Sequence, residues 1–323
     1  MDRRSFLKSA AATTLIRATC PIALAEPAAI PVIDSHIHLF DPTRPGGVPW
    51  PNKSNSVLYR PALPDRYAKL AEPHRVVGAI AVECSPWLID NFWLGDTVDE
   101  NTLMLGYIGD LLPESPDFGA TLDRLHRSDR FLGIRYGNLW NRSLLDAVEK
   151  PEFLAGLKLL AQAGVVFETA NPDATLIAAT LKVSDRVPDL RIVVDHLPNA
   201  QLPQDAHLLN AYESDLRSLS QRPQVYVKGS EILHRVAGQL PMDIEAYKAG
   251  LDRIWDLFGD DRVLFGSDWP NSDSIANYDS TFFIAKSYIS TRSRSAQENY
   301  FWRNSIALYR WKARSPAQRR LSA

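Results

Sequence analysis

The feature that most constrains the fold of this chain is a series of short apolar, β-branched segments between residues 31 and 270. They recur at intervals of roughly 25 to 45 residues, and a helical or loop stretch follows each one. The segments are PVIDSHIH (31–38), RVVGAIAVEC (75–84), TLMLGYIG (102–109), FLGIRYG (131–137), GVVFETA (164–170), RIVVDHL (191–197), QVYVKGS (224–230) and RVLFGSDWP (262–270). Near-continuous hydrophobic strands that alternate with helices indicate a parallel sheet covered by helices. Because a (β/α)8 barrel typically needs about 250 residues, these strands predict an α/β fold of the TIM-barrel class.

The stretches between the strands carry helix signals. PEFLAGLKLLAQAG (151–164) is amphipathic and ends in Gly164, a residue type that commonly terminates helices. DFGATLDRLHRS (117–128) is a second amphipathic stretch. Neither a repeat nor a low-complexity tract interrupts the chain, so we expect a single barrel domain over residues 26–323.

Composition and charge exclude several classes of partner. The formal net charge is -2, and acidic and basic residues are interspersed, so no basic stripe exists for nucleic acid or anionic lipid. No run of 18 apolar residues is present to span a bilayer. We therefore expect a small-molecule substrate, with neither nucleic acid nor membrane as a partner; the sequence does not fix the oligomeric state.

Residues 1–25 have the pattern of an export signal. A basic start is followed by a mildly apolar small-residue stretch and by an Ala23-x-Ala25 ending. Arg3 and Arg4, followed by SFLK, resemble the bacterial twin-arginine signal, although Asp2 stands where Ser or Thr is more usual. The expected location is the periplasm or the exterior, and Cys84 would be the one cysteine of the mature chain.

Polar and charged residues collect at the carboxyl ends of the predicted strands, where (β/α)8 barrels build their active sites. The residues are His36, His38, Glu83, Arg135, Glu168, Asp195, His196, Lys228 and Asp268. Alternation along a strand predicts that His36 and His38 share a face with Asp34 one step deeper. By the same alternation Asp195 should point away from the face of His196, toward helices or loops.

These motifs resemble those of the amidohydrolase superfamily. The H-x-H pair on the first strand is followed in order by VVDHLP, VYVKGS and VLFGSDWP, and the terminal ENYFWRNSIALYRW is similar to the ending of the amidohydrolase-related branch. That branch contains the sugar lactonases and the 2-pyrone-4,6-dicarboxylate lactonase, and the resemblance covers residues 31–311. It implies a (β/α)8 hydrolase that opens a lactone with Asp268 as general base, and it matches His36, His38 and His196 to the family's histidines.

Elementary chemistry agrees with these roles. Lactone hydrolysis needs a base that deprotonates water, a group that polarises the carbonyl, and an acid for the leaving alkoxide. Asp268 can take the proton from water and return it to the ring oxygen, while His36, His38 and His196 polarise the carbonyl or hold a metal that does so. Each residue also has a structural alternative, such as a helix cap for Asp268.

Three further residues are expected to bind substrate. Arg135 suits bidentate contact with a carboxylate, and Lys228 can act as a point charge on a carboxylate or hydroxyl. Glu83 could accept hydrogen bonds from sugar hydroxyls or ligate a metal. Arg135 and Lys228 could equally belong to structural ion pairs.

The metal requirement stays open at the level of sequence. One Zn²⁺ with an open coordination position could be held by His36, His38, His196 and Asp268. Some members of the amidohydrolase-related branch, which this sequence resembles, work without metal. Binuclear amidohydrolases carry a carboxylated lysine on the fourth strand and further histidines on the fifth and sixth. Here the fourth strand offers Arg135, and the fifth offers Glu168 and no histidine. The sequence thus predicts one divalent ion or none.

A long Pro- and Gly-rich segment, FDPTRPGGVPWPNKSNSVLYRP, follows the first strand. Irregular segments of this length usually form lids or binding loops. Trp50 within it could bind substrate, and Trp87, Trp140 and Trp269 follow other strands; packing over the barrel mouth is the alternative. A decarboxylase or hydratase of the related branch and a non-catalytic binding protein are the competing functions.

Overall fold

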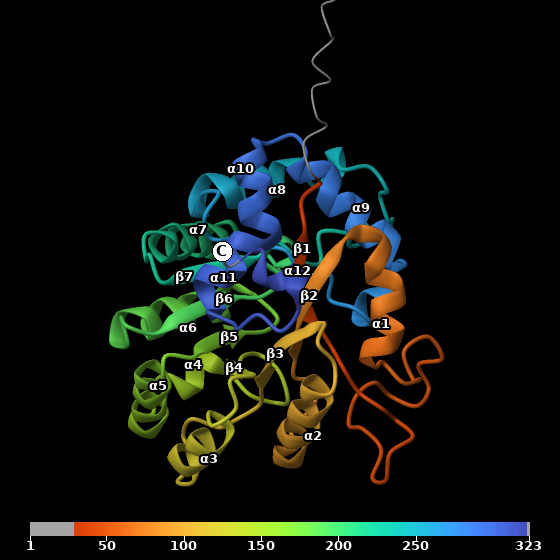
Figure 1. Ribbon diagram of the computed structural model, residues 1–323. Coiled ribbons are helices and arrows are strands. Elements are labelled where there is room, and N and C mark those ends of the chain that lie inside the picture. Colours follow the sequence, from red (N-terminus) through yellow and green to blue (C-terminus); the bar gives the residue numbers. More distant parts are fainter. Residues whose placement is uncertain (1–28, 322–323) are drawn as a thin grey trace, which may run out of the picture.

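The structure is a computed structural model that describes residues 29–321. The predicted signal segment, residues 1–25, lies outside the described residues. The strands form a single sheet in the order β1 to β8, and every neighbouring pair is parallel (Figure 1). The strand bounds are β1 Val32–Ile37, β2 Val76–Val82, β3 Met104–Gly109, β4 Phe131–Arg135, β5 Val166–Thr169, β6 Arg191–Val194, β7 Val225–Lys228 and β8 Val263–Leu264. All of the predicted strands are confirmed, and each is shorter than the apolar segment that predicted it.

The segment after β8 closes the barrel against β1. The backbone N–H of Ser35 donates to the carbonyl of Phe265 over 3.0 Å, and that of His38 donates to the carbonyl of Trp269 over 2.6 Å. The predicted (β/α)8 architecture is therefore confirmed.

Helices surround the barrel (Figure 1). Several of them begin and end at residues that commonly form helix boundaries. Helix α5 has Pro151 in its first turn and ends at Gly164, whose φ of 69° is the left-handed conformation that glycine adopts without strain. The side chain of Asp173 caps α6 by accepting from the backbone of Leu176. The helix bounds are α1 Pro64–Ala71, α2 Leu88–Asp99, α3 Phe118–Leu125, α4 Leu144–Ala147, α5 Pro151–Ala163, α6 Ala174–Arg186, α7 Ala206–Ser220, α8 Glu245–Phe258, α9 Tyr278–Ile289, α10 Arg294–Glu298, α11 Asn304–Tyr309 and α12 Pro316–Arg319.

The core has two parts. An outer layer packs the strands against the helices, and an inner cluster that includes Ile33, Leu105 and Val193 fills the barrel. Tyr309 and Trp311 join the inner cluster from the C-terminal segment, which crosses the end of the barrel where the strands begin (Figure 1). The functional rim is therefore the opposite end, where the strands finish.

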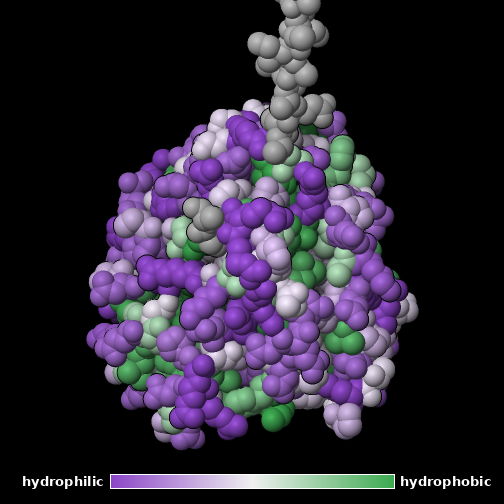
Figure 2. All heavy atoms as spheres, in the orientation of Figure 1, coloured by the Kyte–Doolittle hydropathy of each residue, from purple (hydrophilic) through white to green (hydrophobic). Residues whose placement is uncertain are grey.

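Residues 38–63, between β1 and α1, contain no helix or strand, as the sequence predicted. The face in Figure 2 is covered mainly by hydrophilic side chains. Among the helices of residues 29–321, none has the length and apolarity to cross a membrane.

Candidate active site

Three imidazoles converge on one carboxylate oxygen at the rim of the barrel. The distance from Oδ1 of Asp268 is 3.1 Å to Nε2 of His38, 3.5 Å to Nε2 of His36 and 3.9 Å to Nε2 of His196. All four side chains are buried. The histidines and the aspartate that the sequence singled out on three different strands thus form one cluster.

The backbone brings Asp268 to this position by an irregular path. Strand β8 ends at Leu264, and Asp268 has a left-handed φ of 59° while its N–H donates to the carbonyl of His36 over 2.8 Å. Gly266 permits the close approach, because a Cβ there would lie 2.7 Å from the Cβ of His36. A larger residue at Gly266 would therefore require the chain at Gly266 or at His36 to move.

The prediction that Asp34 shares the inward face of the histidines is wrong. Its carboxylate accepts hydrogen bonds from the hydroxyl of Tyr67 on α1, over 2.8 Å, and from that of Tyr278 on α9, over 3.2 Å. Strand β1 has an irregular register against β2 between Asp34 and Ile37, which breaks the alternation. Asp34 therefore lies between the barrel and the helices and has a structural role.

The prediction that Asp195 points away from the site is also wrong. Its Oδ2 lies 3.6 Å from Nδ1 of His36 and 3.9 Å from a terminal nitrogen of Arg135. Strand β6 stops at Val194, and His196 has a left-handed φ of 53°, so the two neighbours do not alternate. Both side chains consequently face the centre of the barrel.

A cavity of about 250 Å³ opens over this cluster. Its lining residues are His38, Trp50, Cys84, Arg135, Leu139, Trp140, Asn171, His196, Glu231, Asp268 and Asn271. Trp50 lines the cavity as predicted, and its ring lies 5.7 Å from that of His38. Trp269, by contrast, is fully buried away from the cavity, and Trp87 lies outside it with 40% of its surface exposed.

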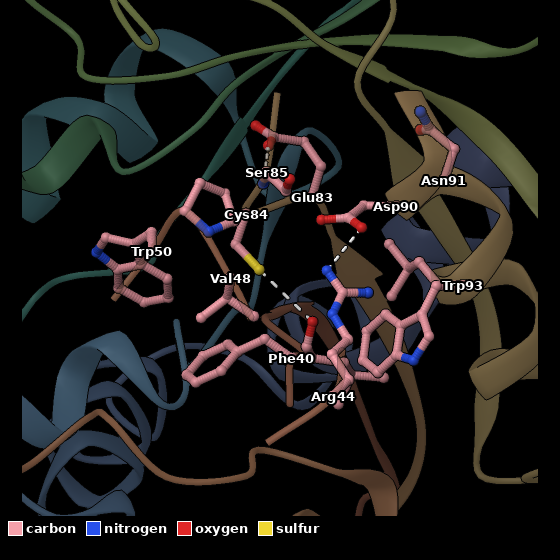
Figure 3. Close-up of a pocket in the computed structure, with 13 residues that line it drawn as sticks. Phe40, Arg44, Val48, Trp50, Glu83, Cys84, Ser85, Asp90, Asn91 and Trp93 are labelled. Atoms are coloured by element: carbon pink, nitrogen blue, oxygen red, sulfur yellow. Dashed lines mark hydrogen bonds and ion pairs between the residues drawn. The ribbon is translucent and has the colours of Figure 1, made fainter. Parts of the chain in front are cut away.

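Arg135 and Glu83 form a buried pair at one wall of the cavity. Nε of Arg135 donates to Oε1 of Glu83 over 2.8 Å, and Glu83 also accepts from the indole of Trp140 over 3.1 Å. Glu83 lines the neighbouring, mainly apolar pocket shown in Figure 3, together with Trp50 and Cys84. Its carboxylate orients Arg135 and Trp140 from behind, and this differs from the predicted contact with substrate.

Lys228 does not line the cavity, which also differs from its predicted role. Its ammonium group is fully buried and lies 2.7 Å from Oε2 of Glu168, 3.1 Å from Oδ1 of Asp195 and 3.0 Å from Nδ1 of His36. The contact with Asp195 is a fully buried ion pair. Glu168 also accepts a hydrogen bond from the hydroxyl of Tyr309, so a polar chain runs beneath His36.

Sequence reasoning missed Glu231 and Asn271. Nδ2 of Asn271 donates to Oδ2 of Asp268 over 2.7 Å, and Glu231 approaches both Asp268 and His196 closely enough to share a cation with them. The predicted seventh strand segment ended one residue before Glu231, whose left-handed φ of 52° turns its side chain into the cavity. An acidic residue directly after KGS was the available signal.

The surroundings of Asp268 shift its pKa toward neutral pH, which suits proton transfer. Burial, and to a smaller extent the carboxylate of Glu231, raises the pKa of its carboxyl to about 7 against the opposing effect of His196. Burial and the charge of Arg135 lower the pKa of His38 to about 4. Burial and the charge of Lys228 hold the pKa of His36 well below its ordinary value. A carboxyl that titrates near neutral pH beside neutral imidazoles suits a general base and acid.

The donor atoms could hold a divalent ion in either of two groups that share Asp268. One group is His36, His38 and Asp268, the other is His196, Glu231 and Asp268, and within each the donor atoms lie within 4.8 Å of one another. The four predicted ligands, His36, His38, His196 and Asp268, do not form one such group among the described residues. Nδ1 of His38 donates to the carbonyl of Val82 over 3.0 Å, so the lone pair on its Nε2 faces the cluster. Nε2 of His36 is buried there without a hydrogen-bond partner among the described residues.

The molecule is a closed (β/α)8 barrel with a carboxylate and three imidazoles at the carboxyl ends of its strands. This combination defines a barrel enzyme that can transfer protons and polarise a carbonyl. The chain belongs to the amidohydrolase family, whose model matches residues 33–311. The prediction that the chain belongs to the lactonase-like, amidohydrolase-related branch is confirmed.

Curated relatives and solved structures agree with this assignment. An L-fucono-1,5-lactonase from Burkholderia ambifaria is 27% identical over 240 residues, which are 74% of this chain and 80% of that protein. An L-fucono-1,5-lactonase from Burkholderia multivorans is 25% identical over 287 residues, which are 85% of this chain and 94% of that protein.

Among solved structures, an amidohydrolase from Burkholderia multivorans with bound HEPES has a TM-score of 0.77 at 21% identity and covers 87% of this chain and 100% of its own. A second crystal form of such an amidohydrolase from that organism contains zinc. A protein from Pseudomonas putida, described provisionally as a 2-pyrone-4,6-dicarboxylic acid hydrolase, has a TM-score of 0.66 at 19% identity, with coverage of 87% and 98%. At these identities the structural matches establish the fold.

Proposed function

We propose that the protein hydrolyses a lactone, with Asp268 activating the attacking water. The observation that carries the proposal is the convergence of three imidazoles on Asp268 at the base of a cavity walled by Trp50, Trp140 and Arg135. The curated relatives named L-fucono-1,5-lactonase support a sugar-derived lactone as the substrate class.

The reaction follows from the geometry. Ionised Asp268 removes a proton from water, and the hydroxide oxygen forms a bond to the carbonyl carbon of the lactone. The imidazole of His196, which lines the cavity, can stabilise the negative charge that develops on the carbonyl oxygen, whereas His36 is fully buried and does not line the cavity. The bond from this carbon to the ring oxygen then breaks, and Asp268 returns its proton to the departing alkoxide. The product is an open-chain hydroxy acid, and Asp268 ends the cycle ionised.

Arg135 gives the cavity its affinity for an anionic or hydroxylated substrate. Its guanidinium lines the cavity, and Glu83 holds it by hydrogen bonds to both side-chain and backbone oxygens, over 2.8 and 2.6 Å. An Arg fixed in this way can donate to a carboxylate or to vicinal hydroxyls without a large loss of side-chain entropy.

If the enzyme takes up a divalent ion, we propose that His196, Glu231 and Asp268 hold it, because their donor atoms lie within 4.8 Å of one another. Such an ion would polarise the lactone carbonyl and acidify the attacking water. The chain's own contribution is unchanged: Asp268 handles the proton, and Arg135 orients the substrate.

A substrate screen tests the function. The purified protein is assayed against sugar lactones and aromatic-derived lactones with a pH indicator, and the metal content of the same sample is measured. We expect proton release with at least one lactone. Inert lactones together with carbon dioxide release from aromatic carboxylates would contradict the proposal and favour a decarboxylase of the related branch.

A further inference from the structure

Lys228 has an unusual place for a lysine on the rim of a barrel. It is fully buried beneath His36, and its ammonium nitrogen lies 2.7 Å from Glu168, 3.1 Å from Asp195 and 3.0 Å from Nδ1 of His36. An ammonium group has three protons and no lone pair, so it can only donate. Nδ1 of His36 must therefore accept, and this nitrogen carries no proton.

This contact determines whether Nε2 of His36 carries a proton or a lone pair. A neutral imidazole that accepts at Nδ1 holds its proton on Nε2. Nε2 of His36 is buried 3.5 Å from Asp268 and has no hydrogen-bond partner among the described residues. A protonated Nε2 is a hydrogen-bond donor and has no lone pair with which to bind a metal.

A second group competes for the same nitrogen. Oδ2 of Asp195 lies 3.6 Å from Nδ1 of His36. A carboxylate at this position would accept a proton from Nδ1, free the lone pair on Nε2 and produce the carboxylate–histidine pairing that is usual behind metal-bound histidines. Lys228 lies at hydrogen-bond distance from Nδ1, whereas 3.6 Å is too long for a hydrogen bond from Nδ1 to Asp195.

We propose that Lys228 is a positioning residue that holds His36 in the tautomer protonated at Nε2, so that His36 directs this N–H toward Asp268 and does not ligate a metal. The tautomer is a property of the free protein. Only the effect of this N–H on Asp268 as the general base rests on the proposed function.

The tautomer can be measured directly. Long-range proton–nitrogen NMR spectra of the protein labelled with ¹⁵N-histidine distinguish the two protonated nitrogens, and a His36→Gln variant assigns the signals of His36. We expect the wild-type signal of the tautomer protonated at Nε2. A wild-type His36 protonated at Nδ1 would overturn the proposal, whether or not any variant folds.

Two variants separate the hydrogen bond from Lys228 to His36 from the effect of a change in buried charge. Lys228→Met combined with Glu168→Gln removes one positive and one negative charge and leaves Asp195 as the partner of Nδ1. Glu168→Gln alone keeps Lys228 and serves as the control. In the double variant the proton should move to Nδ1, and the affinity for zinc alone, measured by calorimetry, should rise about 10- to 100-fold over that of the control.

An unchanged tautomer and an unchanged zinc affinity in the folded double variant would contradict the proposal. Failure of the wild type to hydrolyse lactones would contradict the proposed function alone, because neither readout uses turnover.

Discussion

Asp268 is a carboxyl group whose surroundings place its titration near neutral pH. Burial raises its pKa to about 7, and the nearby carboxylate of Glu231 contributes to the rise. His38 presents a lone pair to Asp268 over 3.1 Å, because its other ring nitrogen donates to a carbonyl. A proton shared between these two acceptors is consistent with the raised pKa. Near pH 7 the protonated and ionised forms of Asp268 therefore coexist, and only the ionised form can act as a base.

The pH dependence follows from this assignment. Since the base form of Asp268 is required, kcat/KM should increase with pH through an apparent pKa near 7 and then level off. Replacing Glu231 with Gln removes a negative charge that raises this pKa, so the rising limb should move to lower pH. Glu149→Gln, on an exposed helix-flanking site, is the control. A rising limb that stays in place or moves to higher pH in Glu231→Gln would argue against Asp268 as the titrating group.

Arg135 gives a second prediction about a single residue. Replacing it with Lys removes the planar donor set that Glu83 fixes, and we expect KM to rise roughly 10-fold or more, with a smaller fall in kcat. Arg142→Lys is the matched control, because Arg142 is in a partly buried ion pair, 2.7 Å from Asp110, but does not line the cavity. Equal KM values for both variants would exclude Arg135 from substrate binding.

At the scale of elements, regular strand geometry decides which residues could be predicted. The apolar pattern located every strand, and the order of the motifs located His36, His38, His196 and Asp268. Alternation then failed wherever a strand departed from regular geometry, because a period of two cannot encode such departures. Strand β1 changes register after Asp34. Strand β6 ends before Asp195, which therefore turns inward.

Left-handed backbone conformations explain the remaining differences. His196, Glu231 and Asp268 all have positive φ, so their side chains do not follow from the strands that precede them. Lys228 does lie on its strand, but only packing shows that its side chain ends under His36 and not in the cavity.

The attachment of helices to the barrel through Asp34 leads to a stability prediction. Its carboxylate accepts from the backbone of Ser267 over 2.9 Å and from the hydroxyls of Tyr67 and Tyr278. Asp34→Ala leaves these buried donors without partners and should lower the free energy of unfolding by about 3 kcal/mol or more. Asp96→Ala, on the exposed face of α2, should change it by less than about 0.5 kcal/mol in the same urea titration. Similar losses for both variants would show that Asp34 is not a buried acceptor.

In the whole molecule, the contacts that stabilise the barrel and the residues that line the cavity lie at opposite ends of it. The C-terminal segment closes the end where the strands begin: the side-chain amide of Gln318 donates to the carbonyls of Val77 and Thr102 over 2.8 and 2.9 Å. The opposite end carries the cavity. Tyr309 links the two ends, because its hydroxyl reaches the Glu168 and Lys228 pair that lies beneath His36.

Export remains a proposal about the full chain, and it is based on residues 1–25 alone. Replacing Arg3 and Arg4 with Lys should leave the protein in the cytoplasm, because the twin-arginine pair is the recognised element of such signals. Cell fractionation and immunoblotting of the variant and the wild type measure this. Unaltered export of the variant would exclude the twin-arginine route.

The central claim is that Asp268 transfers the proton in lactone hydrolysis, and one rate comparison tests it most directly. The initial rate of the wild type on its best lactone is compared with that of Asp268→Asn at a pH above 7.5, after zinc contents have been matched. Because a positioned acid–base group contributes about 10²- to 10⁴-fold, we predict that kcat falls by at least about 100-fold, while the variant keeps the wild-type circular dichroism spectrum. An Asp268→Asn enzyme that opens the lactone at the wild-type rate would contradict the account.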